Sequence, residues 1–167
     1  MSKAEFKIEP VTPDHYADVA RLVLSIQRDE FGIPATYEEQ PDLHDIAGFF
    51  RRGGGEFWVA LAADAPVGTV GLLDIGGGQG ALRKMFVARE WRGENKGVAQ
   101  QLLNRLLGHA TSHGIDDVLL GTIDKFVAAH RFYAKNGFAM IDQRDLPVAF
   151  PRMHVDEMFF RRRSARS

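Results

Sequence analysis

The chain has 167 residues, of which 45% are hydrophobic, and its formal net charge at pH 7 is −1. This length fits one domain with a sizeable core, and the near-neutral charge gives no overall field that would draw the protein to nucleic acid or to a membrane surface. The chain has no cysteine, which excludes disulfides, CxxC metal sites and a thiol nucleophile. Apolar runs stay well short of the ~20 residues of a membrane span, and the N-terminus lacks the apolar segment of a secretory signal, so we expect a soluble, cytoplasmic protein.

The first third of the chain predicts one strand and two helices. Residues 6–8 alternate in polarity and soon meet a proline, as a short strand does. The Thr-Pro-Asp sequence at residues 12–14 is typical of a helix start, and apolar residues then recur at helical spacing to about Arg28. Residues 32–41 are expected to form a loop, and Asp42 is expected to open the second helix. The apolar face of that helix would consist of Leu43, Ile46, Phe49 and Phe50.

The middle of the chain predicts three strands joined by tight turns. Residues 57–61, 67–73 and 81–87 are apolar runs of strand length, separated by turns that contain glycine or proline. Such short links predict an antiparallel meander. The glycines within residues 76–80 lie between two strand patterns, so we interpret them as a hairpin turn and not as a phosphate-binding loop.

The remaining chain alternates helices and strands. A long amphipathic helix is predicted from Val98 to a stop at Gly114, and a short buried strand follows at residues 118–120. A strand–helix–strand crossover of this size favours parallel pairing of the strands that it joins. Another helix is expected over residues 127–136, and two final strands flank residues 147–151.

The element order predicts an α+β protein, a layered sheet with helices on both faces and without an internal repeat or a domain linker. Arg161 to the C-terminus is expected to be a polar tail. Its arginines, Arg161, Arg162, Arg163 and Arg166, could contact nucleic acid, but a solvated terminus fits the near-neutral chain better.

A candidate anion site lies where the third strand of the meander leads into the long helix. Residues 92–99, Arg-Gly-Glu-Asn-Lys-Gly-Val-Ala, form a basic turn with two glycines directly before the helix. Free N–H groups and the helix dipole favour negative charge at such a position, and Arg92 and Lys96 add positive charge. The turn has neither P-loop spacing nor the G-x-G-x-x-G pattern of dinucleotide-binding folds. We therefore expect it to bind a phosphate or a diphosphate.

Two segments resemble motifs of the GNAT superfamily of N-acetyltransferases. Gly97-Val98-Ala99 matches the end of the acyl-CoA loop pattern [QR]-x-x-G-x-[GA], while Arg92-Gly93 lies two residues early, as an insertion of Glu94-Asn95 would place it. The second pattern, N-x-x-A-x-x-[LF]-Y-x-x-x-G-[FY], is met at Ala129, Phe132, Tyr133, Gly137 and Phe138, with Phe126 where the family often has Asn. The element order is similar to that of the family over nearly the whole chain.

The resemblance implies a fold and an activity. The fold would be the GNAT fold, with a mixed, mostly antiparallel seven-stranded sheet and about four helices on both faces, in a single domain over residues 5–163 followed by a tail at residues 164–167. The activity would be transfer of an acetyl group from acetyl-CoA to an amine, of a small molecule or a peptide, by direct attack in a ternary complex and without a metal. A catalytically silent acyl-CoA-binding module, acting as a sensor or interaction domain, is the alternative. A homodimer is left open.

The resemblance also implies which residues would hold acetyl-CoA. The pyrophosphate would lie against Arg92, Gly93, Lys96, Gly97, Val98 and Ala99. The pantetheine and acetyl groups would lie along the backbone of Met85, Phe86 and Val87, where one N–H could stabilise the developing oxyanion. Further cofactor contacts would come from Phe126, His130 and Phe132.

Tyr133 is the candidate acid that protonates the leaving thiolate. A tyrosine with its ordinary pKa of ~10 stays protonated at neutral pH, above a thiol at ~8.5, so it can donate to sulfur as charge builds there. The alternative is a tyrosine that packs against the sheet with its hydroxyl in water.

The general base and the acceptor site are left open by the sequence. The candidate bases Glu30, Glu38, Glu39 and Asp74 could equally be surface acids, with water relaying the proton. Arg83-Lys84 could be sheet-surface charges or could orient an acidic substrate, and His109 and His113 are expected to be structural. The acceptor pocket is expected from residues 31–42 and 146–154. Its apolar wall could include Phe31, Tyr37, Phe150 and Met153, which could equally be packing residues at its rim.

Overall fold

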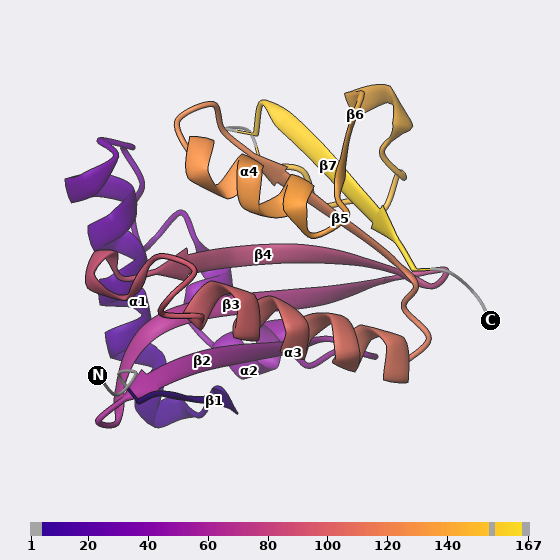
Figure 1. Ribbon diagram of the computed structural model, residues 1–167. Coiled ribbons are helices and arrows are strands. Elements are labelled where there is room, and N and C mark those ends of the chain that lie inside the picture. The colour runs from indigo at the N-terminus through magenta and orange to yellow at the C-terminus, as the bar shows by residue number, and fades with distance from the viewer. Residues whose placement is uncertain (1–4, 154–155, 165–167) are drawn as a thin grey trace.

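The computed structural model describes residues 5–153 and 156–164 and contains one seven-stranded sheet with the strand order β1-β2-β3-β4-β5-β7-β6 (Figure 1). The strands are β1 (Lys7–Pro10), β2 (Glu56–Ala62), β3 (Ala65–Gly76), β4 (Gln79–Val87), β5 (Asp117–Thr122), β6 (Ala139–Ile141) and β7 (Met158–Arg163). The helices are α1 (Tyr16–Leu24), α2 (Ile46–Phe50), α3 (Val98–Ser112) and α4 (Val127–Lys135). The predicted mixed sheet with four helices is confirmed. In the described part of the chain, no helix is long and apolar enough to cross a membrane.

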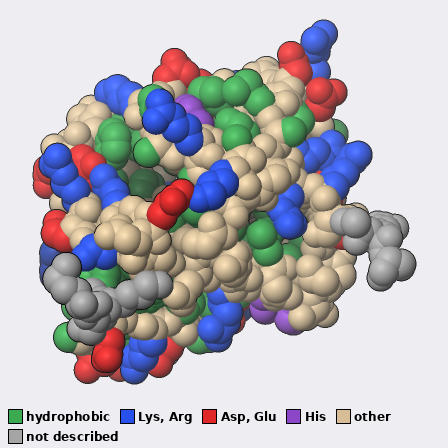
Figure 2. All heavy atoms as spheres, viewed as in Figure 1, with side chains coloured by type: hydrophobic (Ala, Val, Ile, Leu, Met, Phe, Trp, Pro, Cys, Tyr) green, Lys and Arg blue, Asp and Glu red, His purple; other side chains and the backbone are tan. Residues whose placement is uncertain are grey.

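The helices form two layers around the sheet. α3 and α4 cover one face and bury a core that includes Leu102, Leu106 and Tyr133, while α1 and α2 bury a second core on the opposite face (Figure 1). A third, smaller cluster around Leu119 and Phe150 continues that opposite face under the later strands. The surface seen in Figure 2 carries basic and acidic side chains interspersed over the face.

The parallel pair β4–β5 is joined at one end and open at the other. The crossover through α3 makes this pair parallel, as predicted, and the remaining pairs are antiparallel. β4 pairs with β5 only from Gln79 to Ala81. Beyond that point β4 pairs with β3 alone and β5 with β7 alone. The rest of β4, including Met85, Phe86 and Val87, therefore has no strand partner on its β5 side.

A β-bulge lies on the open part of β4. Thr69 of β3 pairs with Phe86 and Gly71 pairs with Arg83, so β4 carries an extra residue between them. Lys84 in this bulge has a φ of 55°, and its carbonyl accepts a hydrogen bond from the Thr69 hydroxyl at 2.7 Å. A bulge breaks the alternation of side chains along a strand. Arg83 and Lys84 are consecutive, yet both reach the same carboxylate, that of Asp42.

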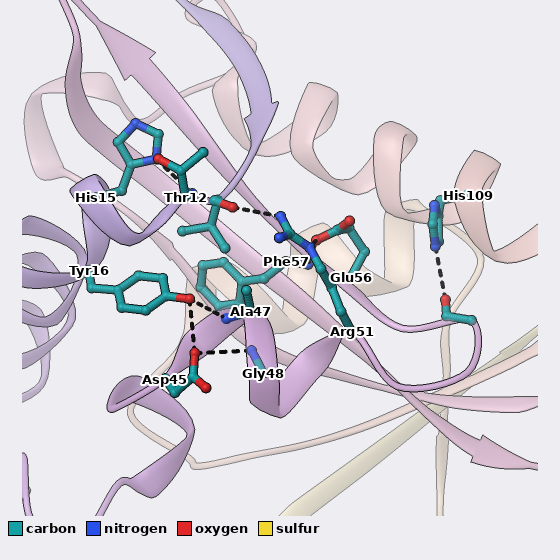
Figure 3. Close-up of polar contacts among 12 residues, drawn as sticks. Thr12, His15, Tyr16, Asp45, Ala47, Gly48, Arg51, Glu56, Phe57 and His109 are labelled. Atoms are coloured by element: carbon teal, nitrogen blue, oxygen red, sulfur yellow. Dashed lines mark hydrogen bonds and ion pairs between the residues drawn. The ribbon is translucent and has the colours of Figure 1, made fainter.

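The first helix is less regular than the sequence predicts. After β1, a 3₁₀ turn at Pro13–His15 comes first, and Thr12 and His15 form its capping box (Figure 3). α1 follows, but residues Ser25–Glu30 continue as a π-helix, in which the Phe31 N–H reaches back to the Ile26 carbonyl. The expectation of one regular helix to Arg28 is therefore wrong in its last turns, because the wider turn replaces the α-helical hydrogen bonds there.

The second helix begins three residues later than the sequence predicts. Asp42 lies in a 3₁₀ turn at Pro41–Leu43 and is buried, and Asp45 is the N-cap of α2, accepting from the Gly48 N–H. Tyr16 of α1 fixes this corner by donating to Asp45 at 3.1 Å and accepting from the Ala47 N–H at 2.8 Å (Figure 3). Asp42 does not start the helix because its carboxylate neutralises buried cations on β4.

The expected polar tail starts too early in the sequence-based prediction. Residues 161–163 belong to β7 and pair with β5. Arg161 donates to the buried carboxylate of Asp117 through Nε at 2.9 Å and Nη2 at 2.6 Å. The buried partner keeps these basic residues in the sheet. Arg166 lies outside the described residues.

Candidate active site

The start of α3 offers open backbone amides. Gly97 is the N-cap and adopts a left-handed conformation with φ 78°, which glycine tolerates without strain. The Gln101 N–H already bonds the Gly97 carbonyl, whereas the amides of Val98, Ala99 and Gln100 have no hydrogen-bond acceptor among the described residues. Such a helix end attracts anions through its N–H groups and the helix dipole.

Glu94 and Asn95 lie in a turn before the helix. The N–H groups of Lys96 and Gly97 both bond the Gly93 carbonyl, at 3.1 and 3.3 Å, and Gly93 has a φ of 107°. Lys96 lies with its ammonium 5.9 Å from the centre of the Trp91 ring. Glu94 forms an ion pair with Lys135 of α4, which links the loop to that helix.

Arg92 makes structural contacts with its whole guanidinium. Its Nε donates to the Val87 carbonyl at 2.8 Å, and its two terminal nitrogens hold the Glu30 carboxylate in a bidentate pair. The hydrogen bond from Arg92 holds the pKa of Glu30 below its usual range. Arg92 therefore ties the end of β4 to the π-helical segment after α1, and Glu30 is fully engaged as an ion-pair partner.

Aromatic side chains from three segments meet beside the open part of β4. The Phe126 ring at the start of α4 packs edge-on against Phe31, with ring centres 4.8 Å apart, and against Phe86 of β4, with ring centres 6.2 Å apart. Lys125 adds a hydrogen bond to the Phe31 carbonyl at 3.1 Å. Figure 2 shows hydrophobic side chains in a hollow on the left of that face, in the region between α1 and α4. Phe126 thus works as an apolar wall where the family often has Asn.

The α4 motif places Tyr133 under the sheet. Its side chain is 5% exposed and its ring contacts Phe138 and Phe160. Burial raises the pKa of Tyr133 well above its ordinary value. No residue of the described chain hydrogen-bonds its hydroxyl, which is left free to donate elsewhere. Phe132 packs at the rim of the same core.

His130 of α4, His109 of α3 and His113, the C-cap of α3, have backbone contacts. His130 Nε2 lies 2.9 Å from the Ile123 carbonyl, and His109 Nε2 lies 2.9 Å from the Gly54 carbonyl. His113 stacks on His109 with ring centres 4.0 Å apart. Within the described ranges, no group of three metal-ligating side chains is close enough to hold a metal ion.

Three of the four acids that the sequence suggests as bases, Glu30, Glu39 and Asp74, make contacts within the fold. Asp74 accepts from the N–H groups of Gly54 and Gly76, and Glu39 pairs with the Thr36 hydroxyl. Glu38 is exposed in the loop before α2. The structure instead brings Asp156, which sequence reasoning missed, against β5: a Cβ on Gly121 would lie 2.5 Å from its Oδ2. No sequence motif marks Asp156.

The expected acceptor walls contain a buried ionic cluster. Asp42, with a 1% exposed side chain, lies 3.0 Å from Arg83 Nη2 and 3.3 Å from Lys84 Nζ. Burial lowers the pKa of Lys84, although Asp42 opposes this shift. Lys84 also donates to Gln40 at 2.7 Å, and Met153 Sδ lies 3.1 Å from Arg83 Nη2. Arg83 and Lys84 are therefore not exposed sheet charges.

The remaining acceptor-wall residues lie in different surroundings. Phe150 is buried against Phe159, whereas Tyr37 is 40% exposed and packs on His44. His154, at the end of the expected pocket, lies outside the described residues.

The fold and the two motifs define the class of protein, an acyltransferase. The chain belongs to the Acetyltransferase (GNAT) family, whose profile matches residues 20–138. A GNAT-family acetyltransferase of Staphylococcus aureus Mu50 is 36% identical, with a TM-score of 0.91 over 95% of this chain and 99% of that one. An N-acetyltransferase of Thermoplasma acidophilum in complex with coenzyme A, 17% identical, shares the fold with a TM-score of 0.72 over 95% of this chain and 99% of that one.

Longer relatives match a part of their length. An N-acetylaspartate synthetase of Danio rerio is 31% identical over 124 residues, which cover 71% of this chain and 43% of the relative. N-acetyltransferase 8F1 of Rattus norvegicus is 32% identical over 112 residues, covering 64% of this chain and 50% of the relative. The chain therefore spans about half the length of these relatives. Acetyltransferases of the GNAT family use acetyl-CoA as their co-substrate.

The residues present fit a coenzyme A thioester. The open amides of α3 suit a diphosphate, and the unpaired side of β4 suits an extended chain of amides such as pantetheine, which can bond to a strand edge as another strand would. The two features are joined in sequence, because the turn at residues 88–97 leads from β4 into α3.

Proposed function

We propose that this domain transfers an acetyl group from acetyl-CoA to an amine by direct attack in a ternary complex. The observation that carries the proposal is the continuity of two backbone features, the side of β4 that has no strand partner beyond Ala81 and the open first amides of α3. An extended thioester with a diphosphate at one end would satisfy both at once. The chain's lack of cysteine removes a thiol acyl-enzyme route.

Backbone groups take most of the cofactor contacts in this proposal. The amides of Val98 and Ala99, with Gly97 and Gly93 shaping the turn, would bind the diphosphate, and Lys96 would supply its positive charge. Arg92 would act through its backbone and by holding the loop, since its guanidinium is paired with Glu30.

The open part of β4 would bind the acyl end. The backbone of Met85, Phe86 and Val87 would bind the pantetheine and acetyl groups, with one N–H as oxyanion donor. Phe126 and Phe132 would line the apolar wall, and His130 would fix the start of α4 through the Ile123 carbonyl.

Tyr133 would donate a proton to the sulfur as the thioester breaks. Its buried position supports this role, because the raised pKa of Tyr133 keeps the hydroxyl protonated until a strong acceptor forms beside it. Its hydroxyl has no competing partner in the described part of the chain.

The matching relatives are named for N-acetyl transfer or synthesis, which favours turnover over a silent acyl-CoA sensor. The name of the Danio rerio relative makes aspartate a reasonable acceptor to test. A cytoplasmic location, a homodimer and the domain limits at residues 5 and 163 stay predictions.

The test combines calorimetry with a thiol-release assay. Acetyl-CoA should bind with a stoichiometry of one per chain, and an amine panel of aspartate, glutamate, neutral amino acids, polyamines and peptide amines should yield at least one acceptor that releases free thiol. Assays without acceptor measure hydrolysis as the background. Tight binding without release for every amine would contradict the proposed turnover, and absence of binding would contradict the proposed site.

A further inference from the structure

Asp156 lies over the open part of the β4–β5 pair. Gly121 of β5 has no side chain, and the Asp156 carboxylate fills that space, so that a Cβ on Gly121 would approach its Oδ2 to 2.5 Å and its Cγ to 2.7 Å. Gly121 lies two residues beyond Leu119, the last β5 residue that pairs with β4. The carboxylate is therefore placed where the two parallel strands have just separated.

The carboxylate lies on the face opposite to Tyr133. Leu120 of β5 packs in the core under α3 and α4, which also contains Tyr133, whereas Leu119 packs with Phe150 on the other face. Side chains alternate along a strand, so the Gly121 position faces the same way as Leu119. α3 and α4 cover the face of Tyr133, and we place the acceptor on the face of Asp156.

Asp156 is held in place but not fully hydrogen-bonded. Its Oδ2 accepts from the Met153 N–H at 3.0 Å, and the Asp156 N–H bonds back to the Met153 carbonyl at 3.0 Å. No described residue donates to its Oδ1. A carboxylate with one fixed oxygen and one available oxygen is suited to accept a proton.

The charges around Asp156 come from β4 and from its own loop. Arg83, Arg152 and Lys84 all act on it, and Asp42 neutralises Arg83 and Lys84 from the side of α2. Burial raises the pKa of Asp156, and the Met153 N–H and the three cations oppose that shift. A carboxylate with a raised pKa is a stronger base than an ordinary surface aspartate.

We propose that Asp156 is the general base that takes a proton from the acceptor amine. This inference rests on the proposed acetyl transfer. As the amine nitrogen forms its bond to the acetyl carbon, one N–H proton passes to Asp156. The carbon–sulfur bond breaks, sulfur takes the proton of the Tyr133 hydroxyl and leaves as the free thiol, Asp156 releases its proton to solvent, and Tyr133 regains a proton from solvent. Acid and base thus act from opposite faces of the sheet.

The direct test is Asp156→Asn with Glu157→Gln as the matched control. Asn keeps the shape of the side chain and can still accept from the Met153 N–H, but it cannot take a proton. We expect kcat to fall by about 100-fold or more, which is typical of a lost general base, with an unchanged dissociation constant for acetyl-CoA. Glu157 is the exposed neighbour and should keep wild-type kcat.

A pH profile separates a base from a structural aspartate. The wild-type kcat/KM should fall as the pH is lowered, and this acid limb of the pH profile should have a midpoint that is the same for acceptors of different amine pKa. Asp156→Asn should lose this limb. Asp156→Glu should restore part of the activity, since it returns a carboxylate. An Asp156→Asn enzyme with wild-type kcat, or one that keeps the fixed limb, would overturn the assignment.

Gly121→Ala tests the same carboxylate without changing it. The added methyl group would displace the Asp156 side chain, so we expect a kcat loss that approaches that of Asp156→Asn, with acetyl-CoA affinity retained. Unchanged kcat would contradict the placement of the base. A wild-type protein that releases no thiol from any amine would instead overturn the proposed function and, with it, the base.

Discussion

Two ionic clusters flank the β4–β5 pair, one at its closed end and one at its open end. At the closed end, the Asp117 carboxylate receives hydrogen bonds from Gln79 at 2.9 Å and from two nitrogens of Arg161. At the open end, Asp42 is ion-paired with Arg83 and Lys84, but neither of its oxygens has a well-aligned hydrogen bond in the described part of the chain.

The pKa values of the carboxyl groups at the two ends are shifted in opposite directions. Burial alone would raise the pKa of Asp117, but its hydrogen bonds from Arg161 and Gln79 hold the pKa below its usual value. Burial dominates at Asp156 and raises its pKa. At the closed end, the Asp117 carboxylate therefore links β4, β5 and β7. At the open end, one oxygen of the Asp156 carboxylate accepts no hydrogen bond from a described residue.

The largest expected effect is on stability, at the open end. Asp42→Ala would leave Arg83 and Lys84 buried without their counter-charge, which destabilises folded proteins by about 3–5 kcal/mol. Urea unfolding at neutral pH measures the change, with Glu38→Ala as an exposed control in the preceding loop. A loss below about 1 kcal/mol would mean that the cations relax into solvent and that the cluster is not a buried unit.

The next effect concerns the acid on the other face of the sheet. Tyr133→Phe should lower kcat by about 100-fold at saturating substrates, as loss of a general acid does, with little change in acetyl-CoA affinity. Stability should change little, because the hydroxyl has no partner in the described chain. Steady-state kinetics with calorimetry of acetyl-CoA binding test this, and an unchanged kcat would leave Tyr133 as a packing residue.

At the closed end, Asp117→Asn should reduce stability and leave kcat unchanged. Removing a hydrogen-bonded charge costs about 2 kcal/mol. The folded pKa of Asp117 is lowered, so its contribution is present above the unfolded pKa of about 4 and is lost as the pH falls through the folded value. The difference between variant and wild type should be full at pH 7 and shrink in acid. A pH-independent difference would argue against the ionised pairing.

The smallest expected effect is on stability at the open end, where the pH dependence due to Asp156 runs opposite to that due to Asp117. The folded pKa of Asp156 is raised, so its stabilising contribution is present below the unfolded pKa and is lost as the pH rises through the folded value. Asp156→Asn should therefore unfold at the same or a higher urea concentration than wild type at pH 7, with the difference disappearing in acid. A clear destabilisation at pH 7 would show that Asp156 fastens its loop.

Local patterns predict the fold well and the site in part. Hydrophobic periodicity and turn residues are local, so they give the strands, α3, α4 and the parallel crossover. The ionic clusters depend on pairings between distant segments, such as Arg161 with Asp117, 44 positions apart. One signal was available: two consecutive basic residues, Arg83 and Lys84, inside an apolar strand indicate a buried counter-charge elsewhere. Nothing in the sequence predicts the bulge that turns both of them towards Asp42.

The most direct test of the central claim is a crystal structure of the protein with bound coenzyme A. The diphosphate should lie within hydrogen-bond distance of the amides of Val98, Ala99 and Gln100, and the pantetheine should run along Met85 to Val87 on the side facing β5. A coenzyme bound elsewhere, or a diphosphate that does not contact the start of α3, would contradict the assignment of the open end of the β4–β5 pair as the active site.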